Sequence, residues 1–178
     1  MKFDFGQPLT GIIQMAYVVD DIHAAMTSWR QSAHVGPWFH LERWTPDPAT
    51  YRGQRSEATI TLAMAFSGEL LIELIQPLDD KPSVYKETIG RTGYGFHHFA
   101  VGSNDYEADV RRYEQHGYSL AFQACVPTGG RVGYMDTKGS LPGFIEVIEN
   151  GPEMEKVFTK FYRAAIQWDG SEPVRSFV

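Results

Sequence analysis

Apolar and polar positions alternate along the chain in short blocks that predict a series of strands and helices. The segment "GIIQMAYVV" (11–19) predicts a buried strand, and "DDIHAAMTSWRQSA" (20–33) predicts a helix that begins at an Asp cap. Three more strands are predicted in "VGPWFHLERW", "EATITLAMAF" and "ELLIELIQP", the last two separated by a turn at Ser67-Gly68. The first part of the chain is therefore predicted to be a β-α-β-β-β unit.

The same order of elements recurs further along the chain. After a polar segment with room for a short helix, "GFHHFAV" predicts a strand and "NDYEADVRRYEQHG" predicts a second helix with an Asn/Asp cap. Strands are then predicted in "YSLAFQACV", "RVGYMDT" and "GFIEVIEN". A shift of 84 (98 minus 14) places Gln14 on His98, and a shift of 73 (146 minus 73) places Glu73 on Glu146. Such self-similarity indicates two copies of one structural unit.

No linker separates the two copies, so we expect a single α+β domain over residues 1–178. Module 1 is expected at about 10–78 and module 2 at about 93–150. The tail from about 152 to 168 has apolar residues at helical spacing and predicts an amphipathic helix that covers the sheet or a partner subunit.

Glu73 and Glu146 are carboxylates in the middle of apolar strands. Burying an ionised carboxylate without a partner costs several kcal/mol, so each is expected to be exposed at a sheet edge, paired, or bound to a metal. If the first and last strands of each copy are neighbours, Gln14, Glu73, His98 and Glu146 converge. Because His97 and His98 alternate along their strand, at most one of them is expected to line this site.

An amide oxygen, two carboxylates and one imidazole form a hard donor set. Such a set suits an octahedral divalent ion with open positions for water or substrate. Taken alone, Gln14 would more often be a buried amide with ordinary hydrogen-bond partners. The prediction of a metal site therefore depends on the placement of all four residues at repeat-related positions.

Composition narrows the class of protein without naming its chemistry. The 178 residues are 43% apolar and 21% charged, with a net charge of -6 and no long apolar run, which favours a soluble protein and no membrane partner. The absence of a Lys/Arg-rich run argues against nucleic acid as a partner. Cys125 is the single cysteine, which excludes an intrachain disulfide, and with no signal peptide visible we expect a cytoplasmic location.

The paired modules, "GFHHFAV", "LIELIQP" and "GFIEVIE" resemble the vicinal oxygen chelate superfamily, the glyoxalase, bleomycin resistance and dioxygenase proteins, from about residue 10 to 150. The resemblance implies a curved, half-barrel mixed sheet around a metal site held by Gln14, Glu73, His98 and Glu146. It implies one divalent ion, such as Zn, Ni, Co, Mn or Mg, and a homodimer. The segment "ELIQPLDDKPSVYKETIGRTGYGFHHFAV" is most similar to methylmalonyl-CoA epimerases, and the Gln, Glu, His, Glu order resembles some glyoxalase I enzymes.

At two positions the sequence differs from these relatives, so the resemblance does not decide which reaction the protein catalyses. Epimerases usually have His and Gln at the first two ligand positions, where this chain has Gln14 and Glu73. A catalytic Glu of the epimerases falls at Thr61 in an ungapped alignment, with Glu57 as the alternative if the register differs. Ring-cleaving iron dioxygenases use two His and one Glu, so Gln14 makes that activity the least favoured.

The resemblance implies a metal-dependent epimerase, isomerase or lyase that removes a proton next to a metal-bound carbonyl through an enolate or enediolate. Glu146 is the expected base and Glu73 the symmetry-related alternative. The substrate is expected to be a small carbonyl compound, either a thioester or a hydrophobic or aromatic molecule. The opposing hypothesis is a metal-free protein that sequesters small molecules. The residues expected to wall the substrate pocket are Trp38, Phe39, Trp44, Tyr51, Thr61 and Tyr134.

Overall fold

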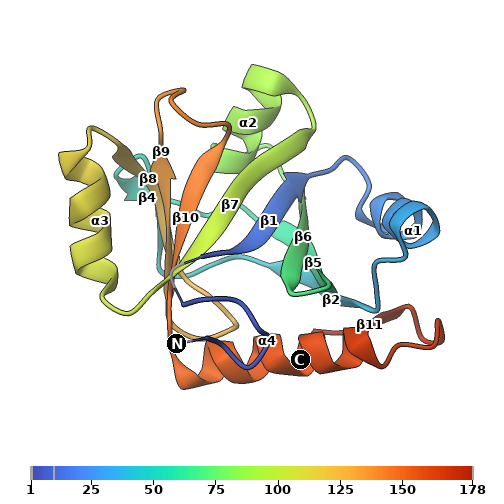
Figure 1. The fold of residues 1–178 in the computed structure, drawn as a ribbon. Coiled ribbons are helices and arrows are strands. Elements are labelled where there is room, and N and C mark those ends of the chain that lie inside the picture. Colours follow the sequence, from blue (N-terminus) through green and yellow to red (C-terminus); the bar gives the residue numbers. More distant parts are fainter. Residues whose placement is uncertain (1, 10, 178) are drawn as a thin grey trace.

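The computed structural model describes residues 2–9 and 11–177 (Figure 1). Residue 10, where module 1 was expected to begin, and the two terminal residues of the expected domain lie outside this part. Within it, four helices surround one curved, unclosed mixed sheet, an α+β architecture as expected (Figure 1). The helices are α1 (Ile22–Ala33), α2 (Val84–Thr92), α3 (Tyr106–Gln115) and α4 (Pro152–Ile166). None of the described helices has the length and apolarity needed to span a membrane.

The eleven described strands run in the order β11-β2-β5-β6-β1-β7-β10-β9-β8-β3-β4 across the sheet. The strands of the first module are β1 (Ile12–Val18), β2 (Trp38–Trp44), β3 (Ala49–Tyr51), β4 (Gln54–Arg55), β5 (Ile60–Ser67) and β6 (Leu70–Pro77). Those of the second are β7 (Gly95–Ser103), β8 (Ser119–Cys125), β9 (Arg131–Asp136) and β10 (Phe144–Glu149), and β11 (Val174–Ser176) follows α4.

The two modules meet at the centre of the sheet through their first strands. β1 pairs antiparallel with β7, while β6 runs parallel to β1 and β10 runs parallel to β7. Each module therefore brings its first and last strands side by side. The helix after each first strand begins in the same way, because Asp21 accepts a hydrogen bond from the Ala24 backbone at 2.9 Å and Asp105 accepts one from Ala108 at 3.0 Å.

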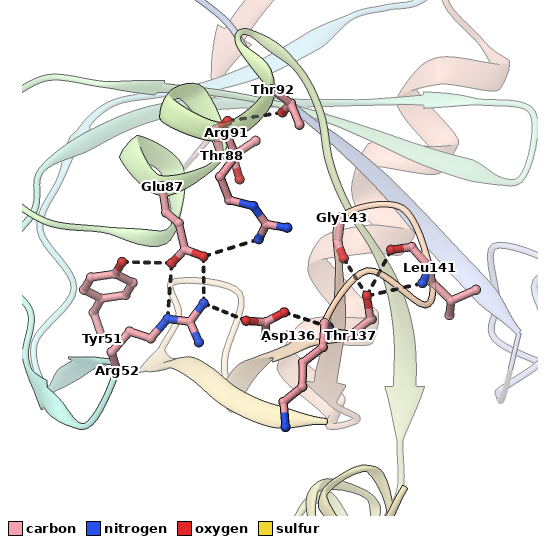
Figure 2. A network of polar contacts seen from close by, with 11 residues as sticks. Tyr51, Arg52, Glu87, Thr88, Arg91, Thr92, Asp136, Thr137, Leu141 and Gly143 are labelled. Atoms are coloured by element: carbon pink, nitrogen blue, oxygen red, sulfur yellow. Dashed lines mark hydrogen bonds and ion pairs between the residues drawn. The ribbon is translucent and has the colours of Figure 1, made fainter. Parts of the chain in front are cut away.

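The hairpin formed by β3 and β4 belongs to module 1 in sequence but lies against module 2. β3 pairs antiparallel with β8, with Tyr51 opposite Phe122. Side chains hold the hairpin in place: Glu87 of α2 accepts hydrogen bonds from Tyr51 at 2.8 Å and from Arg52 at 2.6 Å, and Arg52 also binds Asp136 at 2.7 Å (Figure 2). The hairpin thus ties both modules together.

Helices α1 and α3 cover the outer face of the sheet, one over each module (Figure 1). The inner face carries the largest apolar cluster, and α4 packs against one end of it. Phe161 of α4 is fully buried and stacks on Phe39 of β2 with ring centroids 3.9 Å apart. Phe177 near the end of the chain and Phe5 near its start also pack on α4.

Candidate metal centre and active site

Strand register brings the four expected ligands to the inner face of the central strands. On one rung, Ala16 of β1 lies between Glu73 of β6 and His98 of β7. On the neighbouring rung, Ala100 of β7 lies between Gln14 of β1 and Glu146 of β10. Both alanines are fully buried. Because an alanine ends at Cβ, the four longer side chains can lean over the alanines and meet.

The polar atoms of the four side chains form one compact cluster, buried within the sheet. Gln14 Nε2 donates to Glu73 Oε2 at 3.0 Å and to Glu146 Oε2 at 3.1 Å, and it lies 3.2 Å from His98 Nε2. His98 Nε2 lies 3.0 Å from Glu146 Oε2 and 3.5 Å from Glu73 Oε2. All four residues are 0 to 4% exposed. One chain therefore supplies the whole cluster.

These separations fit the donor spacing around a divalent ion. Neighbouring ligands of an octahedral ion with bonds of about 2.1 Å lie roughly 3 Å apart. Gln14 Oε1 is buried without a hydrogen-bond partner among the described residues, and a rotation of the amide would exchange it with Nε2 and turn an acceptor toward the cluster. The described residues contain no group of His, Cys, Asp or Glu already spread around a metal position. Here the Gln14 amide nitrogen lies between the three other donors, so this rotation is required for binding.

Burial shapes the charge state of the cluster. Burial raises the pKa of Glu146 to about 8, and burial followed by the nearby Glu146 charge raises the pKa of Glu73 well above its ordinary value. Burial also lowers the pKa of His98 to about 3. At neutral pH the folded protein without a cation therefore favours neutral forms of these groups, whereas a bound cation would compensate ionised carboxylates.

His97 departs from the expected alternation along β7. The register of β7 against β1 shifts between Ala16 and Tyr17, which leaves His97 without a partner in the ladder. Its ring therefore turns toward that of His98, and the two Nδ1 atoms lie 2.7 Å apart. The regular alternation expected of this strand is therefore wrong, although only His98 contacts Gln14, Glu73 and Glu146, in line with at most one histidine at the site.

A narrow pocket lies beside the cluster, which forms its polar end. Its volume of ≈ 30 Å³ gives room for about two water molecules. No Lys or Arg lines it in the described part of the chain. The other lining residues are mostly apolar: Trp44, Ile60, Leu62, Met64, Tyr85, Phe122, Val126, Pro127, Thr128, Val132, Tyr134, Ile148, Phe158 and Phe177.

Two of the residues expected to wall the pocket, Trp44 and Tyr134, line it. Phe39 faces the same core but packs on α4, and Tyr51 binds Glu87 in the hairpin network. Trp38 and Thr61 lie away from the pocket. Trp38 packs with α1 on the outer face, and Thr61 lies 2.8 Å from His40 Nε2 and donates to the Leu41 carbonyl. Strand alternation puts both on the face opposite to the cluster.

Pocket residues that the sequence did not single out come from two sources. Met64 of β5 lies opposite Glu73 of β6, and Tyr134 of β9 lies opposite Glu146 of β10. Met64 and Tyr134 therefore occupy equivalent positions in the two modules. The shift of 73 that relates the two glutamates places Tyr134 on Thr61, and only the strand pairing in the structure relates it to Met64. Phe158 and Phe177 follow module 2 and have no counterpart in module 1, so the repeat gives no signal for them.

Comparisons with known proteins identify the family of the chain. A model of the Glyoxalase/Bleomycin resistance protein/Dioxygenase superfamily matches residues 13–134, more than half of the chain. The chain belongs to this superfamily. The matched range includes Gln14, Glu73 and His98 and ends before Glu146 and α4. No curated protein matches the chain in sequence.

Solved structures with the same superfamily fold extend the comparison. Methylmalonyl-CoA epimerase from Mycobacterium tuberculosis is 19% identical with a TM-score of 0.60, over 83% of this chain and 93% of the epimerase. A hypothetical protein from Bacillus halodurans C-125 is 17% identical with a TM-score of 0.61, over 81% and 96% of the two chains. A Streptomyces coelicolor methylmalonyl-CoA epimerase variant in complex with 2-nitronate-propionyl-CoA is 17% identical with a TM-score of 0.57, over 82% and 97%. At these identities the likeness concerns the fold.

Proposed function

We propose that this protein is a metal-dependent enzyme of the isomerase, epimerase or lyase type that removes a proton from the carbon next to a carbonyl group. The observation that carries the proposal is the convergence of Gln14, Glu73, His98 and Glu146 into one buried cluster with separations of 3.0 to 3.5 Å. Members of the superfamily typically bind a divalent metal, which supports this use of the cluster.

The four side chains would hold one divalent cation, with Gln14 Oε1 as the amide donor. When bound, the cation would polarise a substrate carbonyl and stabilise the negative charge that develops after proton removal. The oxygen-rich donor set accommodates Zn, Ni, Co, Mn or Mg.

Glu146 is the proposed base and Glu73 the alternative. Both carboxylates line the pocket, so either reaches a substrate that enters it. Burial raises the pKa of Glu146 to about 8 in the absence of a cation, and a bound cation would lower it, so that Glu146 is ionised and able to accept a proton. Tyr134 lies beside it, paired with Glu146 across β9 and β10, and a hydrogen bond from Tyr134 partly opposes the rise in the pKa.

The pocket supports a substrate with a compact apolar or aromatic group next to the carbonyl. Apolar side chains line all but its polar end, and Phe158 and Phe177 of the C-terminal segment close one side. A thioester remains compatible only if its carrier portion stays outside this pocket.

The test is solvent deuterium exchange into a panel of small carbonyl compounds. Wild-type protein loaded with Zn, Ni, Co, Mn or Mg in turn should exchange at least one compound, and Glu146→Gln should nearly abolish exchange while circular dichroism stays unchanged. Glu73→Gln is the matched variant: each substitution removes one proposed ligand and should weaken metal binding, but at saturating metal Glu73→Gln should keep more exchange than Glu146→Gln. Full exchange by Glu146→Gln would refute its role as the base.

Two outcomes would replace the proposal. Purified protein that binds no divalent metal with micromolar or better affinity would favour the metal-free sequestration protein. Oxygen consumption with an aromatic diol, without proton exchange, would favour an iron dioxygenase.

A further inference from the structure

His97 lies directly behind the ligand cluster and contacts it through one atom. Its Nδ1 is 2.7 Å from Nδ1 of His98, and both side chains are fully buried. The His97 ring is held by aromatic neighbours, with centroids 5.1 Å from Tyr85, 5.5 Å from Tyr134 and 5.2 Å from Phe144. Packing against these three rings therefore restricts the position of the His97 ring.

Two ring nitrogens at this separation share one proton, so one histidine donates and the other accepts. If His97 donates, a neutral His98 carries its own proton on Nε2, where it faces the cluster. If His98 donates, its Nε2 keeps a lone pair directed at the cluster. Only the second arrangement leaves His98 able to bind a cation, because a metal-binding imidazole nitrogen carries no proton.

The two nearest polar neighbours of His98 Nε2 favour different tautomers. Gln14 Nε2, which carries N–H groups and no acceptor, lies 3.2 Å away. A lone pair on His98 Nε2 accepts from this amide, whereas a proton there would donate to Glu146 Oε2, which lies 3.0 Å away. Cation binding requires the lone pair, which is present when His98 donates to His97 through Nδ1.

We propose that His97 is a positioning residue that accepts a hydrogen bond from His98 Nδ1 and thereby fixes the tautomer and ring orientation of His98. Its link to catalysis rests on the proposed function, in which His98 Nε2 binds the cation. His97 then carries its own proton on Nε2, which is buried without a hydrogen-bond partner among the described residues. His97 acts through His98 and does not face the pocket.

Three substitutions separate the hydrogen bond from packing. His97→Asn places an amide oxygen on Cγ, where Nδ1 is attached in histidine, so it can accept from His98. His97→Gln carries the same amide one bond further out, and His97→Leu removes the acceptor. Zinc affinity, measured by competition with a chromophoric chelator, should stay near the wild-type value in His97→Asn. It should fall by about 10- to 100-fold in His97→Gln and His97→Leu, as is usual when a metal-binding histidine loses its partner.

Nitrogen-15 spectra of the metal-free protein read the tautomer directly. His98 should carry its proton on Nδ1 in the wild type and in His97→Asn, and should show a mixture of tautomers in His97→Leu. A wild-type His98 with its proton on Nε2, or equal zinc affinity in folded His97→Asn and His97→Leu, would overturn the proposal. If the wild type binds no zinc, the metal site of the proposed function fails, while the spectra still decide whether His97 fixes His98.

Discussion

At the scale of single residues, the site depends on where the chain places small side chains. Ala16 and Ala100 each lie between two of the ligands, and the repeat that relates Gln14 to His98 relates these alanines as well. The convergence of the four proposed ligands was predictable because the repeat marks them. His97 was not, because a register shift depends on how two strands pair and leaves no mark in the sequence of one strand.

The raised carboxyl pKa values give the metal-free protein a defined dependence of stability on pH. Above about pH 6.5, the unfolded chain keeps less than half of the protons on His97 and His98, and the folded chain keeps almost none, so the two carboxyls outweigh the histidines. Between there and about 8, the folded chain keeps protons on Glu73 and Glu146 that the unfolded chain has lost. The free energy of unfolding should therefore fall as pH rises through this window.

Urea unfolding of chelator-treated protein at several pH values in this range measures the effect. Glu146→Gln should show a smaller fall, because its amide does not titrate and no longer raises the pKa of Glu73. A free energy of unfolding that rises with pH in the wild type would contradict the assignment.

At the scale of elements, strands and helices with strong periodicity and caps were predictable, and short ones were not. The helices after Asp21 and Asp105 and the strands carrying Glu73 and Glu146 lie where the pattern placed them. The strands β3 and β11 have three residues each, too few for an alternating pattern to be recognised in the sequence. The sequence also did not show which face of the sheet Trp38 and Thr61 point to, since apolar side chains lie on both faces of their strands.

The C-terminal segment should influence which substrates enter. Phe177 lines the pocket, whereas Phe161 is equally buried but packs on Phe39 outside the lining. Phe177→Leu should raise the exchange rate of bulky carbonyl compounds relative to small ones. Phe161→Leu is the control, with a comparable loss of stability and an unchanged rate ratio. Equal ratios in both variants would argue against a role for the segment in substrate choice.

The network in Figure 2 should stabilise the hairpin. Arg52→Ala removes the cation between Glu87 and Asp136 and should lower the free energy of unfolding by about 1 to 2 kcal/mol, allowing for partial exposure. Arg55 lies on the same hairpin with 70% of its side chain exposed and longer contacts. Arg55→Ala should change stability by less than about 0.5 kcal/mol. Urea unfolding compares the two, and equal effects would show that the network contributes nothing specific.

At the scale of the whole molecule, the two modules build one site within one chain. β1 and β7 form the junction, and each module supplies two of the four residues proposed as ligands. A homodimer stays a prediction from the resemblance, and the ligand cluster itself does not require one.

The number of bound metal ions should therefore be one per chain, and the affinity should not depend on protein concentration. Titrating a chain diluted until it is monomeric by sedimentation should give the same affinity as the concentrated protein. An affinity that falls on dilution, or one ion for two chains, would show that a second subunit completes the site.

Pairing of β3 with β8 has a consequence for how the chain reaches its native state. During synthesis, the hairpin at residues 49–55 leaves the ribosome long before its partner strand at residues 119–125 is made. Contacts this distant in sequence form slowly, because a long loop must close first. Module 1 expressed alone would keep a hairpin with nothing to pair with, and module 2 alone would expose β8 as a bare edge that invites aggregation. Although it is internally duplicated, the chain should fold as one unit and resist division into its two repeats.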